Sequence, residues 1–273
     1  MAAVSALYVY PIKSCRGIRV PEWPVVARGF AADRRWMIVD AHGKFVTQRE
    51  LPQLALVDVA LETDQLRLSA PGQPELVLPL EHERGEPVTV EVWRDQALGM
   101  AHALGSVWFS NYLAGPHQLV YMPEHHQRAV NPARAQPGDI VAFADAYPFL
   151  VISEASLADL NARLEVPVVM ERFRPNIVVS GSEPFAEDDY ARVKIGQIAF
   201  RGVKRCERCV VTTIDPSTGE RGKEPLRTLA KYRTQDQKVW FGMNLIHDGV
   251  GSLRVGDSVS QLEATTTLAE RAP

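Results

Sequence analysis

The sequence predicts a mixed α/β protein that is mostly β. Its first third contains short apolar runs separated by Pro and Gly residues, and short strands broken by turn residues at this spacing are typical of a barrel or a strongly bent sheet. The run Val88–Trp93 alternates apolar and polar residues, as a half-buried strand does. Farther along, Leu157, Leu160 and Leu164 recur at helical spacing, so that segment is expected to be a helix.

The first third is expected to be entirely β. One strand ends at Pro11, and Ala41-His42-Gly43 is a predicted hairpin turn between two others. In order, the predicted strands are Ala6–Tyr10, Trp36–Val39, Lys44–Thr47, Leu54–Leu61, Gln65–Ser69, Glu75–Leu78 and Val88–Trp93.

The composition changes after residue 95, and helices are expected between the strands. Apolar residues at helical spacing predict a helix over Ala101–Leu113. A second helix begins at Ser153 or Ser156, either of which can cap it, and a short third covers Pro225–Tyr232. The polar, proline-interrupted segment His125–Pro137 is expected to be a loop over a site. The strands predicted here are Gln118–Met122, Val168–Met170, Asn176–Val179, Arg192–Phe200, Val239–Asn244 and Gly251–Leu262.

Length and composition narrow the class of protein. The chain has 273 residues, 46% of them hydrophobic, and a formal net charge of −3, which is typical of an ordinary globular protein with one large or two smaller cores. The near-neutral charge argues against a nucleic-acid partner. The start lacks the features of a signal peptide, and no apolar run approaches the about 18 residues that span a bilayer. With three cysteines indicating a reducing compartment, we expect a cytoplasmic protein without a membrane anchor.

The segment Val203–Gly219 carries the most distinctive chemistry. Cys206 and Cys209 form a Cys-x-x-Cys pair among basic residues, and nearby cations stabilise the thiolate, which is the form that attacks or binds metal. The pair could be a redox dithiol, half of a zinc site or buried core thiols. Zinc is the weaker metal hypothesis because a structural zinc site usually needs four protein ligands and no His pair follows the motif.

Three distant segments share this cationic character: Tyr10–Cys15, Ala32–Trp36 and Arg172–Asn176. Arg is suited to bidentate binding of anions, and Lys adds a point charge. If these segments meet at strand ends around a thiolate, they form an anion-binding pocket with a soft metal ligand.

Five motifs, YPIKSC, DRRWM, PFLVISEASLADLN, FRPNIVV and RCERCVVTTIDPSTGE…KEPLRTLAKYR, occur in this order. Together they resemble the MOSC family, in the branch with an N-terminal MOSC β-barrel domain that includes the amidoxime reducing components and their bacterial relatives. The resemblance runs from about Ser5 to about Leu262. It implies a MOSC-associated β-barrel-like domain over residues 1–95, a MOSC domain over 96–265 and a disordered tail over 266–273.

The resemblance also implies a molybdenum enzyme that reduces N-hydroxylated compounds such as amidoximes and N-hydroxylaminopurines by oxygen-atom transfer. Matched to the family motifs, Cys209 is the molybdenum ligand, Asp145 is an active-site acid that relays protons, and Cys206 is a packed thiol. The implied contacts to the molybdopterin-type cofactor are Lys13, Ser14, Arg34, Arg174, Asn176 and Arg208. Detoxification and pyridoxal phosphate binding are further family-level associations.

Two residues depart from the animal relatives, which tend to carry a small hydroxyl at the position of Tyr147 and a small polar residue at that of Glu207. Three cysteines cannot supply the four thiolates of a ferredoxin cluster, so a separate electron-transfer protein of the ferredoxin or flavin reductase type is the expected partner. A small N-hydroxylated substrate is expected, and nucleic acid and membrane are not. The alternatives are a non-catalytic molybdopterin or sulfur carrier and a dithiol redox protein that uses both cysteines.

Overall fold

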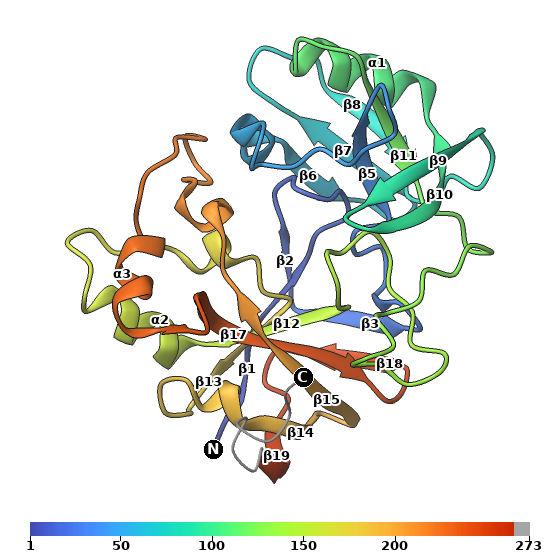
Figure 1. Cartoon of the computed structure of the whole chain (residues 1–273). Helices are drawn as coiled ribbons and strands as arrows, with labels where there is room; N and C mark the ends of the chain where they lie inside the picture. Colours follow the sequence, from blue (N-terminus) through green and yellow to red (C-terminus); the bar gives the residue numbers. More distant parts are fainter. Residues whose placement is uncertain (265–273) are drawn as a thin grey trace.

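The largest sheet is built from both ends of the chain. The computed structural model describes residues 1–264, and its nine-stranded sheet has the order β19-β14-β15-β17-β12-β13-β1-β2, with β16 paired to β17. The first two strands therefore complete a sheet whose other members all follow residue 148 (Figure 1). These strands are β1 (Ala3–Val9), β2 (Ile18–Val20), β12 (Phe149–Ser153), β13 (Ile177–Ser180), β14 (Tyr190–Ile195), β15 (Ile198–Glu207), β16 (Thr234–Gln235), β17 (Lys238–His247) and β19 (Val259–Ala264).

Three smaller sheets complete the β structure, and two of them form the upper half of the molecule in Figure 1. The first has the order β5-β11-β10-β9, with β5 (Trp36–Asp40), β9 (Glu86–Val92), β10 (Asp95–Ala101) and β11 (His117–Tyr121). The second contains β6 (Asp58–Leu61), β7 (Gln65–Ser69) and β8 (Leu76–Pro79). The third, in the lower half, again joins both ends of the chain, through β3 (Glu22–Val26), β4 (Gly29–Phe30) and β18 (Gly251–Arg254). The prediction of a mixed, mostly β fold is confirmed.

The three predicted helices are present as α1 (Ala103–Tyr112), α2 (Glu154–Asn161) and α3 (Leu226–Tyr232). Helix α2 is capped by Ser153, whose Oγ accepts a hydrogen bond from the backbone N–H of Ser156 at 3.0 Å. Such a cap satisfies one of the donors that the first turn leaves free. Of the two caps considered, Ser153 is therefore the correct one.

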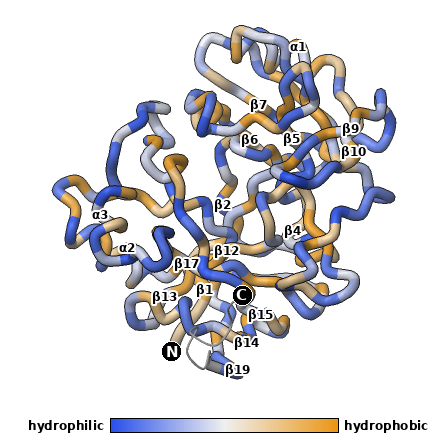
Figure 2. Tube along the Cα trace, viewed as in Figure 1, coloured by the Kyte–Doolittle hydropathy of each residue, from blue (hydrophilic) through white to orange (hydrophobic). Residues whose placement is uncertain are grey.

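The hydrophobic core is divided between the largest sheet and the small sheets of the upper half. One apolar cluster joins Leu7 and Phe30 to Phe149, Phe200 and Leu245 inside the largest sheet. Another packs Trp36, Leu54 and Phe109 beneath α1 and the small sheets. Figure 2 shows hydrophobic residues, coloured orange, along the interior strands of both halves.

Two predicted strands are replaced by short helices, one of them only in part. The strand predicted over Leu54–Leu61 is present over Asp58–Leu61 as β6, but its first residues belong to a 3₁₀ helix over Pro52–Leu56, where Pro52 occupies the first turn and its missing N–H costs no bond. The prediction of a strand over Val168–Met170 is also wrong, since a 3₁₀ helix begins at Met170 and runs to Phe173.

Other predicted strands differ in their limits. Arg192–Phe200 is a hairpin of β14 and β15 that turns at Gly196, where φ is +57°, and Gly accepts a positive φ without steric cost. Gly251–Leu262 likewise divides into β18 and β19. Lys44–Thr47 forms only isolated bridges, such as that between Val39 and Phe45.

The division into domains at residues 95 and 96 stays a prediction. That boundary falls within β10, after its first residue Asp95, and β10 pairs with β9 from Asp95 and Val92 onward. The sheet that contains them continues to β11. The tail predicted over 266–273 lies outside the described residues.

No helix within residues 1–264 is both long enough and apolar enough to cross a membrane.

Candidate functional site

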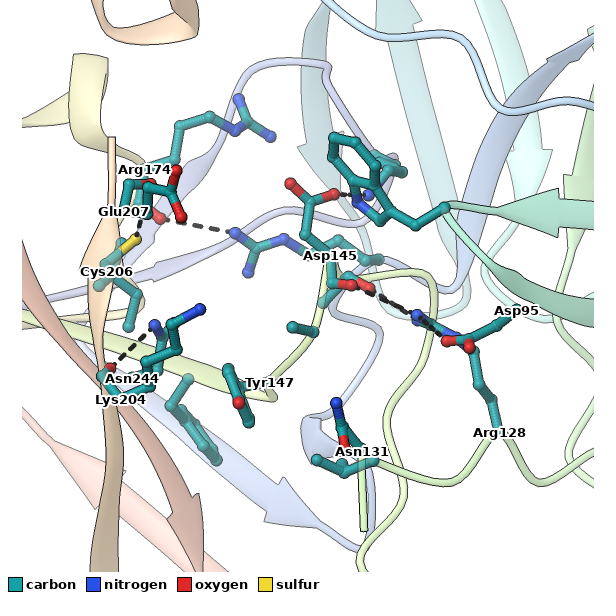
Figure 3. A pocket seen from close by; sticks show the side chains of 18 of the residues that line it. Asp95, Arg128, Asn131, Asp145, Tyr147, Arg174, Lys204, Cys206, Glu207 and Asn244 are labelled. Atoms are coloured by element: carbon teal, nitrogen blue, oxygen red, sulfur yellow. Dashed lines mark hydrogen bonds and ion pairs between the residues drawn. The ribbon is translucent and has the colours of Figure 1, made fainter. Parts of the chain in front are cut away.

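A cavity of about 1150 Å³ lies where the two halves of the molecule meet. Its wall includes all eight residues that the sequence singled out: Lys13, Ser14, Arg34, Asp145, Arg174, Asn176, Arg208 and Cys209. Figure 3 shows Asp145 between a wall that carries Cys206 and Glu207 and a facing wall that carries Asp95 and Arg128. The distant cationic segments therefore converge around the Cys-x-x-Cys segment, as expected.

Cys209 and Cys206 lie on this wall in different settings, and both are free thiols. Cys209 is half-buried and caps a 3₁₀ helix, with its carbonyl accepting bonds from the Thr212 N–H at 3.1 Å and hydroxyl at 2.9 Å. Cys206 Sγ accepts a hydrogen bond from Arg208 at 3.0 Å and packs against a hydrophobic core. Within residues 1–264, no three His, Cys, Asp or Glu side chains are grouped to hold a metal ion.

Irregular pairing explains why so many consecutive residues reach this cavity. The register between β15 and β17 shifts between Gly202 and Lys204 and again between Arg205 and Glu207. Such bulges break the alternation of side chains between the two faces of a strand. Every residue from Lys204 to Cys209 therefore lines the cavity.

Three arginines of the cavity, Arg94, Arg174 and Arg208, have no carboxylate partner within the described part of the chain, and the last two lie near the Cys-x-x-Cys segment. Arg208 donates to the Phe173 carbonyl at 2.8 Å, but its Nε is buried without a partner. Arg174 donates to the Cys15 carbonyl at 2.7 Å, and burial lowers the pKa of its guanidinium. A buried cation without a counter-charge is costly unless something anionic completes its environment.

Backbone strain is concentrated at the same place. Ser14, Arg34 and Arg174 have positive φ angles of 69°, 48° and 56°, as does Trp93 on the facing wall at 59°. For a residue other than Gly this conformation costs on the order of 1 kcal/mol, and it persists where surrounding contacts impose it. These contacts hold the side chains of the cavity in a preset arrangement.

Asp33 joins the wall residues Arg34 and Asn176 in a hydrogen-bonded frame. The amide of Asn176 accepts from Arg34 at 3.0 Å and donates to Asp33 and to the Tyr8 carbonyl at 3.2 Å each. Asn176 is 1% exposed, so its side-chain bonds are already made within the protein. Arg34 also lies 4.2 Å above the ring of Tyr10, and we infer that this network positions the nearby cations.

Lys13, Asp145 and Arg49 form a charged triad. Lys13 donates to an oxygen of Asp145 and, at 2.8 Å, to the Phe143 carbonyl, while Arg49 donates to the other Asp145 oxygen at 3.3 Å. Burial lowers the pKa of Lys13 to about 8, although Asp145 partly opposes this. Burial raises the pKa of Asp145, but the two cations outweigh it and hold that pKa well below its usual range. Asp145 is therefore ionised at neutral pH.

Arg49 is a site residue that the sequence did not reveal. It stacks over Trp93 at 4.8 Å, and although burial lowers the pKa of its guanidinium, the nearby Cys209 and Asp145 side chains outweigh burial and raise that pKa. No motif marks Arg49, because its partners Trp93 and Asp145 lie far from it in the sequence. Sequence reasoning also missed Arg128, Asn131 and Asn244 on the wall, whereas Lys204 was noted only as one of the cations around the cysteines.

Comparison with known proteins gives a consistent result along the whole chain. The model of the MOSC N-terminal beta barrel domain matches residues 1–116, and that of the MOSC domain matches residues 138–260. "Mitochondrial amidoxime-reducing component 1" of Homo sapiens is 36% identical, over 95% of this chain and 82% of that protein. "Mitochondrial amidoxime reducing component 2" of Rattus norvegicus is 38% identical, over 96% and 84%. The crystal structure of the YUAD protein from Bacillus subtilis shares 11% identity at a TM-score of 0.41, over 95% of this chain and 94% of that chain.

Proposed function

Because this chain belongs to the MOSC family, with relatives named as amidoxime reducing components, we propose that it is a molybdenum-cofactor-dependent reductase of N-hydroxylated compounds. The observation that carries the proposal is the half-buried Cys209 thiol beside two arginines without carboxylate partners. The net reaction adds two electrons and two protons to an N–OH group and yields N–H and water. Electrons would come from a separate redox protein.

The residues of the cavity fit an anionic, metal-bearing cofactor. Nine Lys and Arg residues line it against three Asp and Glu residues, although the chain as a whole carries a net charge of −3. The buried Nε of Arg208 lacks an acceptor, which a phosphate or pterin oxygen would supply. A thiolate at Cys209 is a soft ligand of the kind that suits such a metal.

In this proposal Cys209 Sγ ligates molybdenum, and Arg174 and Arg208 donate to the anionic part of the cofactor, with Lys13 and Ser14 beside them. Arg34 and Asn176 hold the frame beneath these cations. When bound, the cofactor supplies a two-electron centre that takes up the oxygen atom, and the protein positions and tunes it.

The charged triad of Lys13, Asp145 and Arg49 suggests which residue could supply a proton. An ionised Asp145 cannot donate a proton, but it can accept a hydrogen bond from the amino group of an amidoxime and orient the N–OH group. The neighbouring Lys13 ammonium, whose pKa is about 8, has a proton to give near neutral pH. We therefore assign the donor role to Lys13 and the orienting role to Asp145.

Replacing Cys209 tests the proposal directly. Protein made in a host that synthesises the cofactor should contain molybdenum and pterin and should reduce benzamidoxime with a reduced electron carrier. Cys209→Ala should lose metal and turnover, because no other thiol of the described chain takes its place. Cys206→Ala is the matched control and should keep both.

The two alternatives give different results. Loss of activity with both cysteine variants, independent of molybdenum, would identify a dithiol redox protein. Bound pterin without turnover in the wild type would identify a carrier. The detoxification and pyridoxal phosphate associations, the donor protein and the cytoplasmic compartment stay predictions.

A further inference from the structure

Four polar side chains at one end of the cavity are not used by the proposed cofactor site: Asn131, Tyr147, Lys204 and Asn244. Figure 3 shows Lys204 and Asn244 together on the wall formed by β15 and β17, with Tyr147 next to them and Asn131 farther along the rim. Asn244 donates to the Lys204 carbonyl at 3.0 Å, which fixes these two residues to each other. Tyr147 and Val203, the neighbour of Lys204, pack against one hydrophobic cluster.

Lys204, Asn131 and Tyr147 offer hydrogen-bond donors to a ligand, while Asn244 uses its NH₂ group to hold the Lys204 carbonyl. Lys204 has no carboxylate within 4.0 Å in the part of the chain that the structure describes. The Asn131 oxygen already accepts from the Ala133 N–H at 3.0 Å, so its NH₂ group remains free for a ligand. Burial raises the pKa of Tyr147, which keeps its hydroxyl protonated and able to donate.

The acidic residues of the cavity do not offset this charge. Asp95 is paired with Arg128 at 2.8 Å, Asp145 with Lys13 and Arg49, and Glu207 with Lys238 at 3.4 Å. The Lys204 ammonium, without a carboxylate partner among the described residues, attracts an anion, and a low-dielectric cavity strengthens the attraction.

This end is separate from the end where Arg208 meets Cys209. Arg208 follows Lys204 by four residues and lies just past the end of β15, a separation on the order of 12 Å for extended chain. A phosphate held by Arg174 and Arg208 would therefore be distant from the Lys204 ammonium. The space between them is where a substrate would extend away from the reacting centre.

We propose that Lys204, together with Tyr147, Asn131 and Asn244, forms a subsite that binds an anionic group of the substrate, a carboxylate or a phosphate. The preferred substrates are then N-hydroxylated compounds that carry a negative charge away from the N–OH group. This specificity rests on the proposed function. The contact acts on binding and leaves the reacting atoms unchanged.

Two substrates of one scaffold test the subsite: neutral benzamidoxime and its anionic 4-carboxy derivative. Wild-type protein should have the higher kcat/KM for the carboxylate. Lys204→Ala should lower that value by about tenfold or more, since a hydrogen bond to a charged group contributes 1.5–3 kcal/mol. It should leave kcat/KM for benzamidoxime unchanged. Lys204→Gln keeps the side-chain length if the alanine variant folds poorly, and Lys231→Ala, exposed on α3, is the control for net charge.

A binding measurement separates this proposal from the enzymatic one. Calorimetric titration of 4-carboxybenzamidoxime into protein without an electron donor should give a Kd that weakens by about tenfold in Lys204→Ala, even if the wild type reduces neither compound. Loss of pterin fluorescence with equal loss of both activities would place Lys204 in the cofactor site and overturn the proposal. Unchanged binding of the carboxylate would also overturn it.

Discussion

Lys13 and Asp145 maintain each other's charge on the wall of the cavity. Burial is the larger influence on Lys13 and lowers its pKa to about 8, while Asp145 raises it again in part. The ammonium therefore loses its proton as the pH rises through about 8. Affinity for an anionic cofactor should fall over the same range, because a neutral amine no longer attracts it.

Asp145→Asn should move this titration to lower pH. Without the carboxylate, the Lys13 ammonium loses its opposing charge while its burial persists, so its pKa should fall below about 8. The ¹³Cε chemical shift of Lys13, followed by NMR in cofactor-free protein, measures the pKa in both variants. An unchanged midpoint would mean that Asp145 does not hold the proton on Lys13.

The Asp145 carboxylate stabilises the folded protein, and this stabilisation decreases in acid. Its pKa in the folded protein lies below the ordinary value of 3.8, so the unfolded chain binds the proton more readily. The stabilisation from Asp145 is thus complete above about pH 4 and is lost as the pH falls through the folded-state pKa.

Strand β15 shows how local irregularity builds the site. Gly202 precedes the first register shift, and a Cβ built there would lie 1.6 Å from the Tyr190 carbonyl oxygen. Only glycine lets β14 and β15 approach this closely. The bulge that follows directs residues 204–209 into the cavity.

Gly202→Ala should therefore lower the free energy of unfolding by about 3 kcal/mol, because backbone atoms must move to relieve the clash. Urea denaturation of the cofactor-free protein measures the change. Gly249→Ala is the control, since no atom lies within 4 Å of its added Cβ, and its effect should stay below about 1 kcal/mol. Equal effects of the two substitutions would contradict this account of the bulge.

The elements that the sequence predicted correctly are those with a local signal. Helix α2 combines a leucine period with a serine cap, and Gln65–Ser69 matches β7. The hairpin of β14 and β15 was not predicted, since Gly196-Gln197 is a weak turn signal. The resemblance pointed to eight residues of the cavity wall, but Arg49 becomes a site residue only through contacts between distant segments.

At the scale of the whole molecule, the division into two domains does not coincide with two independent cores. Strand β1 pairs with β13, and six residues before position 31 belong to the core of the largest sheet: Val4, Leu7, Val9, Val20, Val25 and Phe30. At roughly 1.5–3 kcal/mol each, their burial matches the total stability of a typical domain.

A fragment of residues 96–264 should therefore not fold by itself. We expect it to show no cooperative urea transition in tryptophan fluorescence, whereas the full chain shows one. Adding residues 1–95 as a second chain should restore the transition, because it supplies β1 to β4. A sigmoidal transition for the fragment alone would show that the C-terminal part has a sufficient core of its own.

The assembly of one cavity from Lys13 at one end of the chain and Cys209 near the other has a consequence for biosynthesis. Until β17 has been synthesised, β15 lacks one of its two neighbouring strands, so the wall that carries Cys209 is incomplete on the nascent protein. Segments emerge in order from the N-terminus, so under the proposed function a cofactor could be inserted only after β17 has left the exit tunnel. Insertion would then follow translation of these strands, and its yield would depend on cofactor supply when the cavity closes.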